Sequence, residues 1–127
     1  MIIKLLSTLR HYALFLVVFY IISITVLSLI NINRLPDIGT NHDDKLYHAS
    51  AYFVFVILSF NYLKKIEVKK AVLIAMVFSV FYGIIIEVLQ HVLNTNRTFD
   101  ILDIVANTIG VILGYFIIQY VNKLKLN

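Results

Sequence analysis

The chain has 127 residues, of which 61% are hydrophobic and 14% charged, and its formal net charge is +4. Soluble domains carry nearer to about 25% charged residues, so this composition excludes an ordinary water-soluble domain and predicts a single membrane domain, residues 1–127. The basic residues flank apolar runs without interleaved aromatic residues, which excludes nucleic acid as a partner, and the lack of cysteine excludes disulfides and thiolate chemistry.

Four apolar stretches are each long enough to cross the hydrocarbon core, which takes about 20 residues of helix. They cover residues 12–30, 46–63, 71–89 and 101–121. The first follows basic residues but is longer than the apolar part of a signal peptide, so we interpret it as an uncleaved signal anchor. The predicted fold is an all-α integral membrane protein, a bundle of four transmembrane helices.

The basic residues indicate how the bundle is oriented. Eight lie on the side that holds both termini and the loop 64–70, and three lie on the other side. The eight are Lys4, Arg10, Lys64, Lys65, Lys69, Lys70, Lys123 and Lys125, and the three are Arg34, Lys45 and Arg97. The positive-inside rule therefore predicts that both termini are cytoplasmic and that loops 31–45 and 90–100 face outward.

Polar residues gather at the predicted outer ends of the last three helices. The residues expected to bind a ligand there are Asp44, Lys45, His48, Glu87, Gln90, Arg97, Asp103 and Asn107. An ionisable group inside a bilayer is costly unless it is paired or hydrated, so such groups usually face the interior of a helix bundle. We therefore expect these side chains to meet at one extracytoplasmic site.

Spacing along the last helix supports one interior face. Asp103, Asn107, Gly110 and Gly114 follow steps of four, three and four, which places them within a stripe roughly 60° wide. Gly110 and Gly114 form a GxxxG pair, the pattern through which a neighbouring membrane helix packs closely. We therefore expect these two glycines to be helix-packing residues.

Simpler roles for the acidic residues stay open. Asp43, Asp44, Asp100 and Asp103 stand near predicted helix starts, where carboxylates cap the helix and complement its dipole. Glu87 could instead pair with a basic residue purely to hold the helices together.

Metal binding is a further alternative. Three pairs of metal-ligating residues have helical spacing, namely Asp44 and His48, Glu87 and His91, and Asp100 and Asp103. None of these pairs is a recognised zinc motif, and Glu87-x3-His91 lacks the paired histidines of HExxH. We therefore predict no metal and no cofactor.

Two ordered motifs resemble those of a known family. The stretch Asp44-Lys45-Leu46-Tyr47-His48, followed by Tyr52, resembles the DK-x-x-H-x-x-x-Y signature of VanZ-like membrane proteins. The second block, which begins at Tyr82-Gly83, resembles the family pattern E-x-x-Q … R … D-x-x-x-N-x-x-G-x-x-x-G. Its members here are Glu87, Gln90, Arg97, Asp103, Asn107, Gly110 and Gly114. The resemblance covers residues 36–116.

The resemblance implies a multi-pass protein of the bacterial cytoplasmic (inner) membrane and cell envelope. The founding member of the family is associated with resistance to teicoplanin, an antibiotic that binds peptidoglycan precursors outside the membrane. The family pattern does not include His91, and it implies no particular reaction. Whether this chain confers antibiotic resistance does not follow from the resemblance.

Two classes of function remain after these observations. The first is a non-enzymatic protein that binds a lipid-linked cell-wall precursor, a lipid head group or a lipoglycopeptide. Lys45, His48 and Arg97 would then contact the phosphate or carboxylate of this ligand. The second is an intramembrane enzyme that modifies a lipid head group or glycan, with His48, Glu87 and Asp103 as candidate catalytic residues. A transporter is the least favoured, because no helix is broken at mid-membrane. Membrane lipids are the expected partners, and a homo-oligomer is an open alternative.

Overall fold

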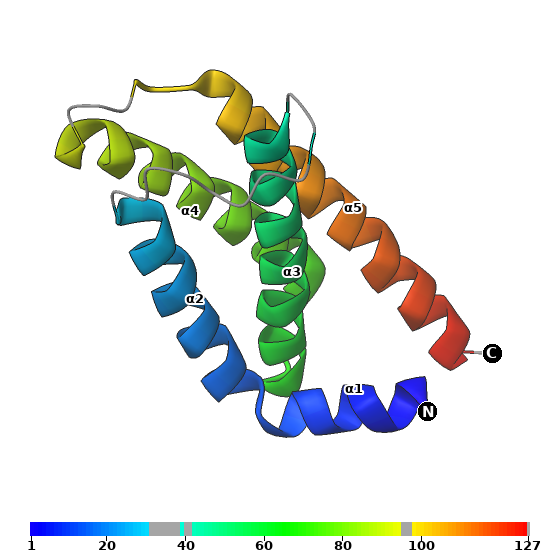
Figure 1. The fold of residues 1–127 in the computed structure, drawn as a ribbon. Coiled ribbons are helices and arrows are strands. Elements are labelled where there is room, and N and C mark those ends of the chain that lie inside the picture. The colour runs from blue at the N-terminus through cyan, green and yellow to red at the C-terminus, as the bar shows by residue number, and fades with distance from the viewer. Residues whose placement is uncertain (31–38, 40–41, 95–97, 127) are drawn as a thin grey trace.

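The computed structural model describes residues 1–30, 39, 42–94 and 98–126 of the chain. Five helices make up this part, and it contains no strand. They are α1 (Ile2–His11), α2 (Ala13–Leu29), α3 (Asp43–Lys65), α4 (Ala71–Leu93) and α5 (Ile101–Leu126) (Figure 1). The structure thus confirms the predicted all-α fold.

Helices α3, α4 and α5 are each long and apolar enough to cross a membrane. The adjoining helices α1 and α2 meet that test together, although they are bent by 77° at the break between them, and they supply a fourth candidate span. Most helix ends lie within a few residues of the predicted ones. Three of the four predicted spans are thus single helices of the structure, and the first corresponds to a candidate span only if the bent pair α1 and α2 is taken together.

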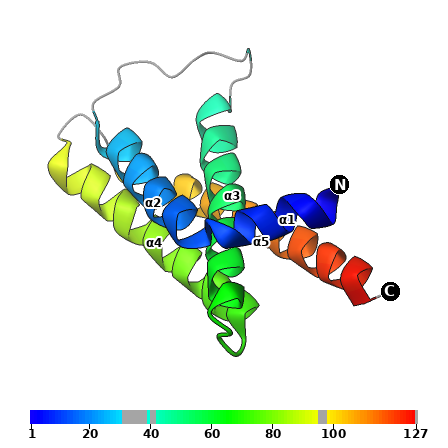
Figure 2. The same ribbon diagram turned by 90° about the horizontal axis from the view of Figure 1, so that it is seen from below.

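The first helix of the structure, α1, was not predicted from the sequence. It contains Lys4 and Arg10, and a charged side chain is costly in hydrocarbon, which explains why α1 does not simply continue the apolar helix α2. The chain bends at Tyr12, and α1 lies across one end of the other helices (Figures 1 and 2). The Nζ atom of Lys65 donates a hydrogen bond of 2.8 Å to the carbonyl of His11, which ties α1 to the end of α3.

The outer faces of the helices are apolar. Phe15, Phe81 and Phe116, on three different helices, are 67%, 61% and 60% exposed. Apolar surface on this scale would aggregate in water but is the ordinary lipid-facing surface of a membrane protein. The exposed apolar side chains therefore support the inference from the composition that lipid surrounds these helices.

Helix α3 forms the centre of the packing and contacts all four other helices. Its residues Phe55 and Val56 are fully buried, as is Val111 of α5. The hydroxyl of Tyr20 on α2 donates a hydrogen bond of 2.7 Å to the carbonyl of Ala51 on α3. The interior is therefore largely aromatic and aliphatic, and its buried polar residues include Ser59, Asn61 and Ser79 besides those near the starts of α3 and α5.

The closest approach in the bundle is between α3 and α5, and it occurs at the two glycines of the GxxxG pair. A Cβ atom built on Gly110 would overlap the backbone carbonyl of Ala49. A Cβ atom on Gly114 would overlap the side chain of Val56 and lie 3.1 Å from the carbonyl oxygen of Phe53. Because neither glycine has a side chain, the two helices come close enough for polar residues at their starts to interact.

The helix ends fall into two groups. The turn between α3 and α4, helix α1 and the C-terminal end of α5 lie at one end of the molecule (Figure 1). The starts of α3 and α5 lie at the opposite end. The eight basic residues singled out above belong to the first group. Which end faces the cytoplasm remains a prediction from this charge distribution.

Candidate functional site

Polar side chains of α3 and α5 meet where these two helices begin. His48 follows Asp44 by one helical turn on α3, and Asn107 follows Asp103 by one turn on α5, so each helix presents two polar residues on one face. The group comprises Asp44, Lys45, His48, Asp100, Asp103 and Asn107, and it is called the α3–α5 polar cluster below.

Lys45 is the cation of this cluster. Its Nζ atom donates a hydrogen bond of 2.5 Å to Asp100 Oδ2 and a second one to Asp103 Oδ1, and lies 3.6 Å from Asp44 Oδ2. The side chain of Asp103 is only 5% exposed, whereas that of Asp100 is 39% exposed. A buried carboxylate is tolerated in a membrane protein when a cation pairs with it, and Lys45 is the cation that pairs with Asp103 inside the bundle.

Asp100 has two roles at the start of α5. Its Oδ1 atom accepts a hydrogen bond of 2.9 Å from the backbone N–H of Leu102, so Asp100 does cap this helix. The hydrogen bond from Lys45, followed by that from Leu102, holds the pKa of Asp100 below its usual range. A lowered carboxyl pKa means that the interaction is fully present above the ordinary value and is lost only as the pH falls through the lowered one.

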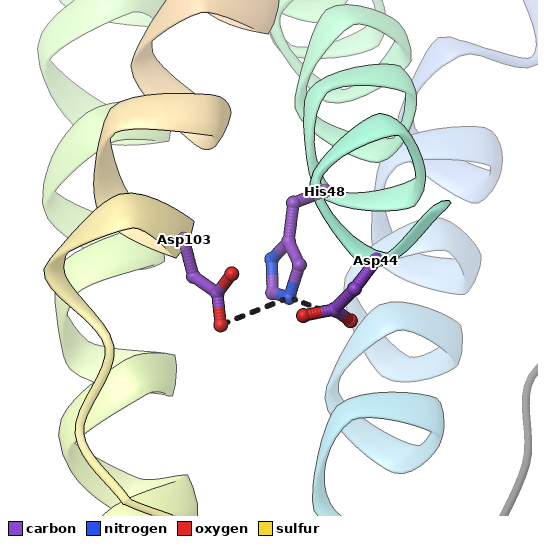
Figure 3. A group of neighbouring side chains, drawn as sticks. All are labelled: Asp44, His48 and Asp103. Carbon is purple, nitrogen blue, oxygen red and sulfur yellow. Dashed lines mark ion pairs between the residues drawn. The ribbon is translucent and has the colours of Figure 1, made fainter. Parts of the chain in front are cut away.

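His48 is held from both sides of its ring. Its Nδ1 atom lies 3.0 Å from Asn107 Oδ1, within hydrogen-bond distance. Its Nε2 atom lies 3.6 Å from Asp103 Oδ2 and 3.8 Å from Asp44 Oδ1. Figure 3 shows the imidazole between the two carboxylates, one from each helix. Since the side chain is only 13% exposed, the ring has a defined position at the edge of the interior.

Helix α4 reaches the cluster through Glu87. The Oε1 atom of this buried residue accepts a hydrogen bond of 3.1 Å from the backbone N–H of Asp100. Gln90 instead turns towards α2, where its Nε2 atom donates a hydrogen bond of 2.9 Å to the carbonyl of Ser28. His91 is exposed, and its ring meets the edge of Phe99. The histidine of the pair Glu87-x3-His91 therefore lies outside the buried site.

Tyr52 and Gly83 lie directly beneath the cluster. A Cβ atom on Gly83 of α4 would lie 3.0 Å from Asn107 Nδ2 and 3.0 Å from Tyr52 Cε1, so both side chains rest against the α4 backbone. Tyr52 is 4% exposed. Its hydroxyl has no hydrogen-bond partner within the described part of the chain, and neither does the Oε1 atom of buried Gln90.

Most of the predicted ligand-binding residues come together in the structure. Asp44, Lys45, His48, Asp103 and Asn107 belong to the cluster, and Glu87 contacts it through Asp100. Gln90 stands apart, facing α2. Arg97 lies outside the residues that the structure describes.

Two polar connections were not predicted from the sequence. Asp100 was assigned to a cap and not to the ligand-binding set, although its position one turn before Asp103 places both carboxylates near one cation. Thr25 of α2 and Tyr82 of α4 share a hydrogen bond through their hydroxyl groups. No spacing rule relates these last two residues, because they lie on helices that are not adjacent in the sequence.

The fold and the cluster define a multi-pass α-helical membrane protein whose charged side chains are paired between two helix ends. The VanZ/LLP1 family matches residues 11–122, and the chain belongs to this family. Comparisons with the curated proteins and with the solved structures found no match. The family match confirms the resemblance that the motifs indicated and extends it over nearly the whole chain.

Proposed function

We propose that this VanZ-family protein binds the polar head group of a lipid-linked envelope molecule in the α3–α5 polar cluster. The observation that carries the proposal is the buried hydroxyl of Tyr52, beside Asn107, which has no hydrogen-bond partner within the described residues. A buried polar group left without a partner costs about 1–3 kcal/mol, and a bound head group would remove that cost.

The cluster becomes more buried from its outer edge inwards, as a binding site does. The side chain of Asp44 is 44% exposed, that of Lys45 is 27% exposed and that of Asp103 is 5% exposed. A head group that approaches from the end of the bundle would meet Asp44 first and Asn107 last. A set of ion pairs that served only to join helices would not need this gradient of exposure.

The chemistry of the cluster favours a ligand rich in hydrogen-bond donors. Asp44, Asp100 and Asp103 offer carboxylate oxygens, and a single ammonium group, that of Lys45, is already shared among them. Sugar hydroxyls and amines donate to such oxygens. A lipid-linked cell-wall precursor, a glycosylated head group or a lipoglycopeptide such as teicoplanin carries these groups, and the first is the ligand that we propose.

The proposal places the site on the extracytoplasmic side of the bacterial cytoplasmic membrane. The lysine-rich turn and both chain ends lie at the other end of the bundle, which the positive-inside rule assigns to the cytoplasm. A protein with this orientation would meet precursors after they reach the outer leaflet. Glycopeptide antibiotics act on the same side, which links the proposal to teicoplanin resistance.

A second candidate function is an intramembrane enzyme that acts on a lipid head group or glycan. It is favoured by the position of His48, whose ring is oriented by Asn107 while its Nε2 atom faces two carboxylates. A histidine held in this way suits general acid or base catalysis. Incubation of the purified protein with lipid-linked precursors, followed by mass spectrometry of the lipids, distinguishes the two functions, because only the enzyme yields a changed product.

Binding is tested with the purified full-length protein and a panel of polyprenyl phosphate, a glycosylated polyprenyl diphosphate and teicoplanin. We expect the glycosylated lipid to bind, and Asn107→Leu to weaken its binding at least 10-fold, because this change removes the hydrogen bond that orients His48. Gln119→Leu is the matched control, since it makes a similar change on the same helix, nearer its C-terminal end. Equal affinity in all three proteins, or no binding by any, would refute the proposal.

A further inference from the structure

We infer that Asp44, His48 and Asp103 form a binding site for one divalent metal ion. Each residue offers one ligand atom, and these atoms all lie within 4.8 Å of one another. They come from two helices, so no spacing within one helix could reveal the complete set (Figure 3). Spacing along single helices gave only pairs of ligands, none of them a recognised zinc motif, which is why no metal was predicted from the sequence.

The distances suit a metal better than direct hydrogen bonds. The Nε2 atom of His48 lies 3.6 Å from Asp103 Oδ2 and 3.8 Å from Asp44 Oδ1, beyond the usual range for a hydrogen bond. Two ligand atoms that each lie about 2.1 Å from a tetrahedral zinc ion are roughly 3.4 Å apart. The ligand oxygens of the two carboxylates lie within 4.8 Å of each other, so a movement on the order of 1 Å, easiest for the exposed Asp44, would complete the arrangement.

Asn107 prepares the histidine to be a ligand. Its Oδ1 atom lies 3.0 Å from His48 Nδ1 and can only accept, so the tautomer that donates its Nδ1–H there would leave Nε2 to bind a metal. The Nε2 atom faces one oxygen of each of the two carboxylates (Figure 3). Histidine ligands in metal sites usually donate their other ring N–H to an oxygen in this way. Asn107 is 3% exposed, so water does not compete for this hydrogen bond.

The charge of the cluster also favours a divalent cation. Three carboxylates and the ammonium group of Lys45 leave a charge of −2 when His48 is neutral, and a divalent ion would balance it. Lys45 does not occupy the same space. It contacts Oδ1 of Asp103 and lies nearest Oδ2 of Asp44, whereas the other oxygen of each carboxylate faces His48.

One imidazole nitrogen and two carboxylate oxygens are ligands that suit Zn²⁺ or Mn²⁺. Three protein ligands leave at least one coordination position for another group, as in sites where a metal contacts a substrate or water. If the proposed function holds, a phosphate or hydroxyl oxygen of the head group would take this position. The metal site itself does not depend on that function, because its ligands all belong to the chain.

The site is tested by metal binding to the purified full-length protein in detergent micelles. After treatment with a chelator and its removal, Zn²⁺ and Mn²⁺ are titrated separately in competition with a metal indicator dye. We expect one high-affinity ion per chain, a loss of more than about 100-fold for His48→Gln, and a loss of about 10–100-fold for Asn107→Leu. Asp43→Asn is the control, because it removes a negative charge next to Asp44, in the first turn of α3, without removing a ligand.

A spectroscopic measurement separates coordination from general attraction between charges. Bound Mn²⁺ should show magnetic coupling to a histidine nitrogen in the wild-type protein and in Asp43→Asn, and none in His48→Gln. Unchanged affinity in His48→Gln, or an equal loss in Asp43→Asn, would overturn the inference. Lipid binding that persists in chelator while no metal binds would also overturn it, and would leave the proposed head-group function standing.

Discussion

Replacing Lys45 with methionine is expected to destabilise the helix bundle by about 3 kcal/mol. The substitution keeps most of the apolar part of the side chain but leaves the carboxylate of Asp103, which is 5% exposed, without its cation. Removing one partner of a buried ion pair typically costs about 3–5 kcal/mol, and the lower end applies because Lys45 is 27% exposed. Unfolding in mixed detergent micelles, followed by the loss of helical signal, measures the change.

The same substitution elsewhere supplies the control. Lys69→Met removes a lysine from the exposed turn between α3 and α4 and should change stability by less than about 0.5 kcal/mol. Adding Asp103→Asn to Lys45→Met should recover part of the loss, since the amide carries no charge to compensate. Equal effects at Lys45 and Lys69 would contradict the view that the α3–α5 polar cluster is held together by its cation.

Replacing Gly110 with alanine is expected to weaken the packing of α3 on α5 by about 1–3 kcal/mol. The new Cβ atom would overlap the backbone carbonyl of Ala49, and a backbone atom cannot move aside without moving its helix. Gly114→Ala should cost less, because its closest neighbour is the side chain of Val56, which can change its rotamer. The same unfolding measurement ranks the variants.

Leu113→Ala serves as the control for the glycine variants. Leu113 lies on α5 between the two glycines but is 51% exposed on the outer face, so its truncation should have the smallest effect of the three. Gly110→Ala should also weaken metal and head-group binding, because separating the helices moves Asp103 away from His48. A larger effect at Leu113 than at Gly110 would show that the helices do not pack as described.

Much of the architecture can be predicted from the sequence because a lipid bilayer restricts the backbone conformations that a chain can adopt. Only helices satisfy their own backbone hydrogen bonds in hydrocarbon, so long apolar runs predict helices, and Gly110 and Gly114 predict a close helix contact. The bend at Tyr12 was not predicted. It depends on how the basic residues of α1 are placed at the end of the bundle, which hydropathy along the chain does not describe.

The members of the site were easier to predict than their contacts. Helical spacing groups Asp44 with His48 and Asp103 with Asn107, but it does not say how α3 is turned relative to α5. The rotation of α3 relative to α5 places Asp103 opposite both Lys45 and His48. The same rotation brings together the three proposed metal ligands. The orientation of α4 relative to α2, which spacing does not give either, turns Gln90 towards Ser28 and away from the cluster.

We propose that the α3–α5 polar cluster, and not the lysine-rich end, holds the head group of a lipid-linked envelope molecule. The most direct test is a glycosylated polyprenyl diphosphate with a photoactivatable head group, crosslinked to the protein in vesicles and mapped by mass spectrometry of its peptides. We expect labelled peptides from the start of α3 and the start of α5, with labelling reduced in His48→Gln. Labelling confined to the turn between α3 and α4, where Lys64, Lys65, Lys69 and Lys70 would attract any anionic lipid, would contradict it.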